Sequence, residues 1–123
     1  MTNLPIWSAW PVELRFSSAG ASLRITFDDG FEGEIPYELL RVESPSAETR
    51  GHGAEALPPP GGKRNVRVTG AEPVGRYAVR LRFSDGHDSG LYPWPLLREL
   101  AEQKQDRVDA YLARLRAAGL TRD

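Results

Sequence analysis

The sequence contains two copies of one short pattern, and this duplication constrains the fold more than any other feature. Apolar residues occupy alternate positions in residues 23–27 and again in residues 79–83. Alternation with a period of two predicts a strand with one buried face. Each strand is followed by an Asp-Gly dipeptide, at 29–30 and at 85–86, which favours a tight hairpin turn. The pattern therefore predicts two similar antiparallel hairpins.

A helix start follows each hairpin. After an apolar residue, Ile35 or Leu91, come the similar segments Pro-Tyr-Glu-Leu-Leu at 36–40 and Pro-Trp-Pro-Leu-Leu at 93–97. Proline suits the first turn of a helix because its φ is already close to the helical value. Apolar residues then recur at intervals of three and four, which predicts one amphipathic helix from about 95 to 118. Its second half either completes the core or contacts a partner.

The remaining segments fit an α+β fold. Residues 12–16 and 66–74 predict further strands, so we expect about six short, mainly antiparallel strands from two hairpin–helix repeats, with a C-terminal amphipathic helix. Residues 43–63 are rich in Gly and Pro and show no periodicity, which predicts a long loop. The expected organisation is an N-terminal arm at 1–10, a single domain at 11–118 and a tail at 119–123.

Composition excludes several classes of site. The 123 residues include no Cys, which rules out disulfides, thiolate metal sites, iron–sulfur ligation and cysteine nucleophiles. No apolar run approaches the ~20 residues that a membrane helix needs, and no secretion signal is found, so we expect a cytoplasmic protein that does not contact membranes. Neither a nucleophile elbow nor a phosphate-binding glycine loop occurs. We therefore expect no enzyme activity from this chain on its own.

Basic residues concentrate in one block. Residues 58–84 hold six basic residues and one acidic residue, although the net charge of the chain is −1. One interpretation is that Arg80 and Arg82 lie on the solvent face of a strand and pair with acids on its neighbours. The alternative is an anion- or nucleic-acid-binding surface formed by the basic residues from Arg64 to Arg82. We favour the first, because nucleic-acid binders usually carry a net basic domain.

Taken in order, these blocks resemble a known family. Residues 27–41, 66–69 and 83–97 are similar to the domain of unknown function 971 (DUF971) family, also called the gamma-butyrobetaine hydroxylase-like N-terminal domain. The resemblance spans roughly residues 10–115 and fits the stand-alone bacterial type. In larger proteins this domain is joined to gamma-butyrobetaine and trimethyllysine dioxygenases or to P-loop iron–sulfur carriers. The resemblance thus implies a non-catalytic accessory module whose protein partner is an iron–sulfur carrier or an oxygenase.

The resemblance also implies a metal site, from which this sequence departs. The dioxygenase versions hold a structural zinc ion through three Cys and one His, which correspond here to Ser44, Ser46, Thr49 and His87. Because hydroxyl groups are poor zinc ligands, we expect no metal site and no cofactor. The alternative is a weak zinc or iron site in which His87 acts with residues of the long loop, namely Glu43, Glu48, His52 and Glu55.

Three turn residues have simpler interpretations. His87 follows the second turn, where it either contacts Ser44 or Ser46 or is a partly solvated turn histidine. Asp29 and Asp85 belong to the Asp-Gly dipeptides, and turn chemistry accounts for both without a catalytic role.

Candidate contacts with a partner lie near both ends of the chain. Trp7 and Trp10 belong to the Pro-bounded N-terminal arm, which either folds back onto the sheet or docks elsewhere. The apolar residues Tyr111, Leu112 and Leu115 of the C-terminal helix are candidates for a protein interface, including a homodimer through this helix.

Overall fold

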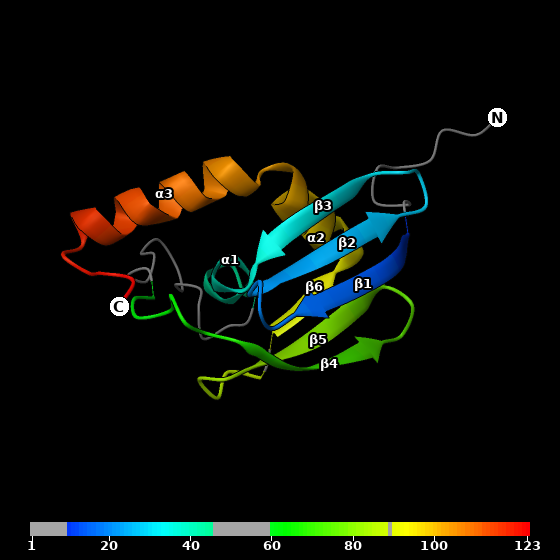
Figure 1. The fold of residues 1–123 in the computed structure, drawn as a ribbon, viewed down its shortest axis with the longest axis horizontal. Coiled ribbons are helices and arrows are strands. Elements are labelled where there is room, and N and C mark those ends of the chain that lie inside the picture. Colours follow the sequence, from blue (N-terminus) through cyan, green and yellow to red (C-terminus); the bar gives the residue numbers. More distant parts are fainter. Residues whose placement is uncertain (1–9, 46–59, 89) are drawn as a thin grey trace, which may run out of the picture.

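The computed structural model describes residues 10–45, 60–88 and 90–123, whose centre is two antiparallel three-stranded sheets (Figure 1). The first sheet contains β1 (Pro11–Ser17), β2 (Ser22–Phe27) and β3 (Glu32–Pro36) in that order, and the second contains β4 (Val68–Val74), β5 (Ala78–Phe83) and β6 (Gly90–Pro93). Helix α1 (Tyr37–Val42) follows β3, and helices α2 (Trp94–Glu102) and α3 (Lys104–Ala117) follow β6. The described residues form an α+β fold with six strands, as predicted.

The two repeats form matching backbone hydrogen bonds. In the first turn the Phe27 amide donates to the Phe31 carbonyl at 2.8 Å, and in the second turn the Phe83 amide donates to the His87 carbonyl at 2.9 Å. The first amides of α1 and α2 also donate to equivalent carbonyls, those of the residues just before β2 and β5. The duplication predicted from the sequence is confirmed.

The second repeat contains one extra residue between its turn and its third strand. Ile35 of β3 pairs with Leu23 of β2, whereas Val79, the counterpart of Leu23, pairs with Tyr92. Tyr92 is therefore the equivalent of Ile35, and both side chains are fully buried. Matching Ile35 with Leu91 from the sequence was wrong by one residue, because the insertion shifts the register and a shift of one residue exchanges the two faces of a strand.

One hydrophobic core is shared by both sheets and the helices. In β2 and β5 every second side chain is buried, and the arginines between them, such as Arg24 and Arg80, are exposed. Leu40 of α1 and Leu97 of α2, which are equivalent in the two repeats, are fully buried in the same cluster. Because residues from both repeats fill one core, neither repeat has a hydrophobic core of its own.

The C-terminal helical segment is divided at Gln103, which corrects the prediction of one continuous helix from about 95 to 118. Gln103 has φ −106° and ψ 20°, and the chain changes direction there (Figure 1). As a result α2 packs against β3 and β6, whereas α3 packs against α1 and α2. None of the helices in the described part of the chain is long and apolar enough to cross a bilayer.

Candidate functional site at the second hairpin turn

Each hairpin turn is held by an arginine from the helix of the other repeat. Arg98 of α2 binds Asp29 in the first turn, with Nη1–Oδ1 and Nη2–Oδ2 distances of 3.1 and 3.0 Å. Arg41 of α1 binds Asp85 in the second turn, with an Nε–Oδ2 distance of 2.8 Å. Because the repeats exchange these ion pairs, the two turns are equivalent places in the fold and their side chains can be compared directly.

The first turn is filled by aromatic and apolar groups. Phe31 packs on Phe27 with ring centroids 6.1 Å apart, and the Arg98 guanidinium lies 4.2 Å from the Phe31 centroid, which is a cation–π contact. Gly33 leaves room for Ala101, since a Cβ at Gly33 would lie 2.8 Å from that of Ala101. Beside its exposed tip, the first turn therefore packs mainly against aromatic and apolar groups.

The second turn carries polar groups at the same positions. His87 takes the place of Phe31 and packs on Phe83, again with ring centroids 6.1 Å apart. Ser44, which follows α1, is the counterpart of Ala101 in α2. The side chain of Ser44 is buried. Ser44 Oγ lies 2.9 Å from His87 Nε2, within hydrogen-bond distance. This contact is one of the alternatives that the sequence left open for His87, and it distinguishes the second turn from the first.

A buried tyrosine extends this contact into the core. The Tyr92 hydroxyl donates a hydrogen bond to the Leu40 carbonyl at 2.5 Å and also has Ser44 as a hydrogen-bonding neighbour. Burial raises the pKa of Tyr92, so its hydroxyl stays protonated. Gly90 makes space for this arrangement, because a Cβ there would lie 2.7 Å from Ser44 Oγ and 2.9 Å from Tyr92 Cε1. The site thus joins α1, the second turn and β6.

The charges of the second turn centre on Asp85. Its Oδ2 atom lies 2.6 Å from Lys63 Nζ and 2.8 Å from Arg41 Nε. Burial raises the pKa of Asp85, but hydrogen bonds from Lys63, the His87 amide and Arg41 outweigh burial and lower the pKa to about 2. Arg41 Nη1 is the only side-chain polar atom in the described ranges that is buried without a hydrogen-bond partner. In the second turn two cations therefore share one carboxylate, whereas in the first turn one cation, Arg98, is shared by the carboxylates of Asp29 and Glu102.

The structure brings together only part of the residue set expected from the sequence. Ser44 and His87 are in contact, and Glu43 pairs with Arg107 at 3.1 Å. Across residues 10–45, 60–88 and 90–123, no three His, Cys, Asp or Glu side chains are placed to share a metal ion. The other expected residues, Ser46, Glu48, Thr49, His52 and Glu55, lie outside the described residues.

Two important members of the cluster were missed by sequence reasoning. Arg41 and Lys63 both bind Asp85, yet neither shows a local motif. A signal for Arg41 was available in the duplication, because Arg41 and Arg98 follow the Leu-Leu pairs of the two repeats. For Lys63 the sequence offered no comparable signal.

The basic block is largely paired with acids. Arg80 and Arg82 lie 3.7 and 3.8 Å from the Glu72 carboxylate on the neighbouring strand. Arg64 binds Asp123 with an Nε–Oδ1 distance of 2.6 Å. This arrangement agrees with the interpretation that Arg80 and Arg82 are solvent-facing strand residues paired with a neighbour.

The residues expected to face a partner differ in exposure. Trp10 is 46% exposed, whereas Tyr111 and Leu115 are only 4% and 2% exposed, because α3 packs them against the rest of the domain. Leu112, on the same helix, is half-buried. Trp7 lies outside the described residues. Of the three helix residues, Leu112 alone is open to contact.

Fold and site together define a class of protein, a duplicated α+β domain in which one of two equivalent turns has a histidine–serine contact where the other has a phenylalanine and an alanine. The family model described as "Gamma-butyrobetaine hydroxylase-like, N-terminal" matches residues 14–98. The chain belongs to this family, which confirms the resemblance noted in its sequence blocks. No curated protein matches the chain.

Solved structures of similar proteins have the same fold. Two NMR solution structures are each 43% identical in sequence, with TM-scores of 0.81 and 0.79. They cover 99% and 94% of this chain, and in each case 90% of the other chain. A crystal structure of a protein of unknown function of the DUF971 family from Acidithiobacillus ferrooxidans is 36% identical, with a TM-score of 0.61, and covers 74% of this chain and 91% of that one.

Proposed function

We propose that this protein is a non-catalytic accessory domain that binds a protein partner in the cytoplasm and needs no metal ion. The observation that carries the proposal is the 2.9 Å contact between Ser44 and His87. These are two of the positions that correspond to zinc ligands in the dioxygenase versions of the family. The contact ties the segment after α1 to the second turn, so side chains alone make the connection that zinc makes there.

The donor atoms at this turn do not suit zinc. A hydroxyl and one imidazole are a poor ligand set for an ion that prefers thiolate, imidazole and carboxylate groups. The carboxylate of the turn, Asp85, is already bound by Lys63 and Arg41. These two cations would also repel a divalent ion. The proposed role of Ser44 and His87 is therefore structural.

Elemental analysis tests the metal-free part of the proposal. The purified protein is supplied with zinc or iron, desalted and analysed beside the His87→Ala variant, with Ser44→Ala as a matched control. We expect metal well below one equivalent per chain in all three proteins. One equivalent of zinc or iron in the parent protein that is lost in His87→Ala would establish the alternative, a metal-binding domain.

The partner is proposed to be an iron–sulfur carrier or an iron-dependent oxygenase, as the fused forms of the family suggest. Calorimetric titration of this domain with purified candidates of both kinds from the same organism tests this assignment. We expect saturable binding to one of them that a chelator does not change. Absence of binding to both, with the domain folded by circular dichroism, would contradict the assignment.

A further inference from the structure

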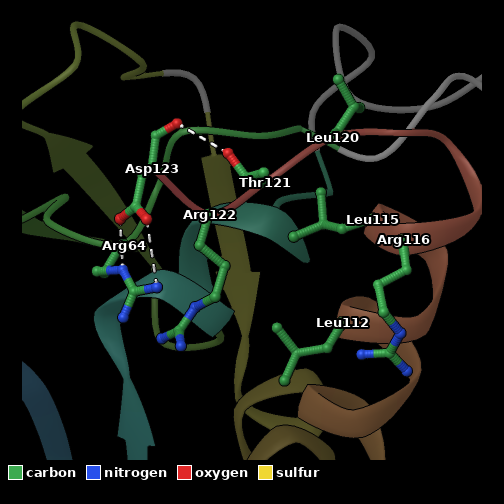
Figure 2. A pocket seen from close by; sticks show the side chains of 8 residues that line it. All are labelled: Arg64, Leu112, Leu115, Arg116, Leu120, Thr121, Arg122 and Asp123. Carbon is green, nitrogen blue, oxygen red and sulfur yellow. Dashed lines mark hydrogen bonds and ion pairs between the residues drawn. The ribbon is translucent and has the colours of Figure 1, made fainter.

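A pocket lies between the last turns of α3 and the segment that follows it, with a volume of about 290 Å³. This segment is fixed against residues 62–64, since the Gly62 and Arg64 amides donate to the Thr121 and Arg122 carbonyls at 3.0 Å each. Figure 2 shows the residues that line the pocket, which are Arg64, Leu112, Leu115, Arg116, Leu120, Thr121, Arg122 and Asp123.

The lining combines apolar surface with positive charge. Leu112, Leu115 and Leu120 form the apolar part, and Leu120 is 39% exposed, which is high for a leucine. Three arginines accompany one aspartate, so the lining is net positive. A surface of this kind complements a ligand that carries an apolar group beside an anionic group.

The three guanidinium groups retain hydrogen-bonding capacity. Arg122 uses Nε and Nη2 to bind the Glu38 carboxylate at 3.0 and 2.6 Å, and Arg64 uses Nε and Nη2 to bind Asp123 at 2.6 and 3.5 Å. Arg116 has no ion-pair partner within the described ranges and is exposed. Figure 2 shows Arg116 and Arg64 on opposite sides of the pocket. Arg116 is thus the cation available to an incoming carboxylate.

A second hollow extends the surface along α3. It has a volume of about 100 Å³ and shares Leu112 and Arg122 with the first pocket. Small-molecule sites bury most of their ligand in one enclosed cavity, whereas two open hollows in a row suit an extended segment that places one side chain in each. The arrangement therefore favours a polypeptide over a small molecule.

We propose that this surface binds an acidic segment of the partner protein. One apolar side chain of the segment packs on Leu112 and Leu120, and a neighbouring Asp or Glu carboxylate pairs with Arg116. Arginine binds carboxylates through two parallel hydrogen bonds, which gives the contact direction as well as strength. The inference rests on the proposed function and adds the place and the chemistry by which the partner is bound.

An NMR titration of the full chain tests this inference. The probe is a short synthetic peptide in which one Leu is flanked by Glu residues; a peptide with Gln in place of Glu and free octanoate serve as comparisons. We expect the acidic peptide to shift the amide signals of Leu112, Arg116 and Leu120, and Arg116→Glu to weaken its binding about tenfold. Arg76→Glu is the matched control. It makes the same charge change in the β4–β5 turn, at the other end of the molecule (Figure 1), and should leave binding within about twofold.

Three results of the NMR titration would overturn the inference. The first is an absence of shifts at the pocket residues, and the second is an equal loss of binding in Arg116→Glu and Arg76→Glu. The third is binding of octanoate without binding of the peptide, which would assign the pocket to a small carboxylate. In a separate measurement, a partner protein that binds Arg116→Glu with unchanged affinity would contradict the inference about this surface but leave the proposed function intact. Absence of binding by every candidate partner, while the peptide still binds, would contradict the proposed function but leave the inference about this surface intact.

Discussion

Asp85 connects three segments that are far apart in the sequence. Its carboxylate binds Arg41 of α1 and Lys63 of the segment before β4, and it accepts the backbone amide of His87 in its own turn at 3.1 Å. A residue that sequence reasoning explained by turn chemistry alone therefore also organises the charges of the candidate site. The two roles are compatible because they use different oxygens. Oδ1 accepts the hydrogen bond from the His87 amide within the turn, and Oδ2 binds Arg41 and Lys63.

We predict that Asp85→Asn destabilises the protein at neutral pH by about 1–3 kcal/mol, since it leaves Arg41 and Lys63 without their shared carboxylate. The pKa of Asp85 is about 2 in the folded protein against 3.8 for the ordinary group. The contribution is therefore fully present above pH 3.8 and is lost as the pH falls toward 2. Urea unfolding at several pH values should show the parent and the variant converging in acid.

Asp29→Asn is the matched control for this prediction. Hydrogen bonding from Arg98 lowers the pKa of Asp29 as well, but its side chain is 45% exposed against 23% for Asp85. Solvent screens the more exposed pair, so its loss should cost less. A loss of stability in Asp29→Asn equal to or larger than that in Asp85→Asn would contradict the prediction that the second turn depends more strongly on its carboxylate.

Gly90 offers a second test at the scale of single residues. Gly90→Ala should destabilise the protein by about 1–3 kcal/mol, because the new methyl group overlaps Ser44 Oγ and the Tyr92 ring. It should also shift the NMR signals of the His87 ring. Gly70→Ala is the control, since a Cβ there first meets the flexible end of Arg82 at 3.2 Å. Unaltered His87 signals in Gly90→Ala would contradict the assigned contact.

At the scale of elements, α3 belongs to the protein's own core. We predict that Leu115→Ala lowers the free energy of unfolding by about 2–5 kcal/mol, the usual range for a fully buried leucine. Leu112→Ala, on the same helix, should cost clearly less because Leu112 is only half-buried. Urea unfolding followed by circular dichroism measures both. Equal, small losses would mean that α3 is only loosely attached.

Sequence reasoning located most elements because their signals are local. Alternating apolar residues and Asp-Gly turns define β2 and β5, and Pro before an aromatic residue defines the starts of α1 and α2. The break at Gln103 was missed because it involves neither Gly nor Pro. It follows from packing, since α2 lies against the sheets and α3 against α1.

The candidate site was only partly predictable. A contact of His87 with Ser44 or Ser46 was one of two interpretations that the sequence left open, and the structure places Ser44 and His87 together. The cluster around Asp85 depends on pairs such as Arg41–Asp85, whose members are separated by 44 residues. Such partners become apparent only when tertiary contacts are known, because no local pattern records which opposite charge lies nearby.

At the scale of the whole molecule, the shared core makes the two repeats interdependent. We predict a single unfolding transition that is the same by circular dichroism and by tryptophan fluorescence. A fragment covering only the first repeat, residues 10–45, should be unfolded in isolation because its buried residues lose their partners from β5, β6 and α2. A folded spectrum of this fragment, or two separate transitions of the full chain, would contradict this prediction.

The exchanged arginine–aspartate pairs give the single chain the contact pattern of a symmetric dimer. In a dimer of identical subunits related by a twofold axis, every contact occurs twice, with the roles of the two subunits exchanged. Arg41 with Asp85 and Arg98 with Asp29 follow this rule within a single polypeptide. The two repeats of this one chain therefore contact each other as the subunits of a symmetric dimer do. The correspondence is incomplete, because one turn has a phenylalanine where the other has an imidazole, so only one of two equivalent places can form the contact with a serine.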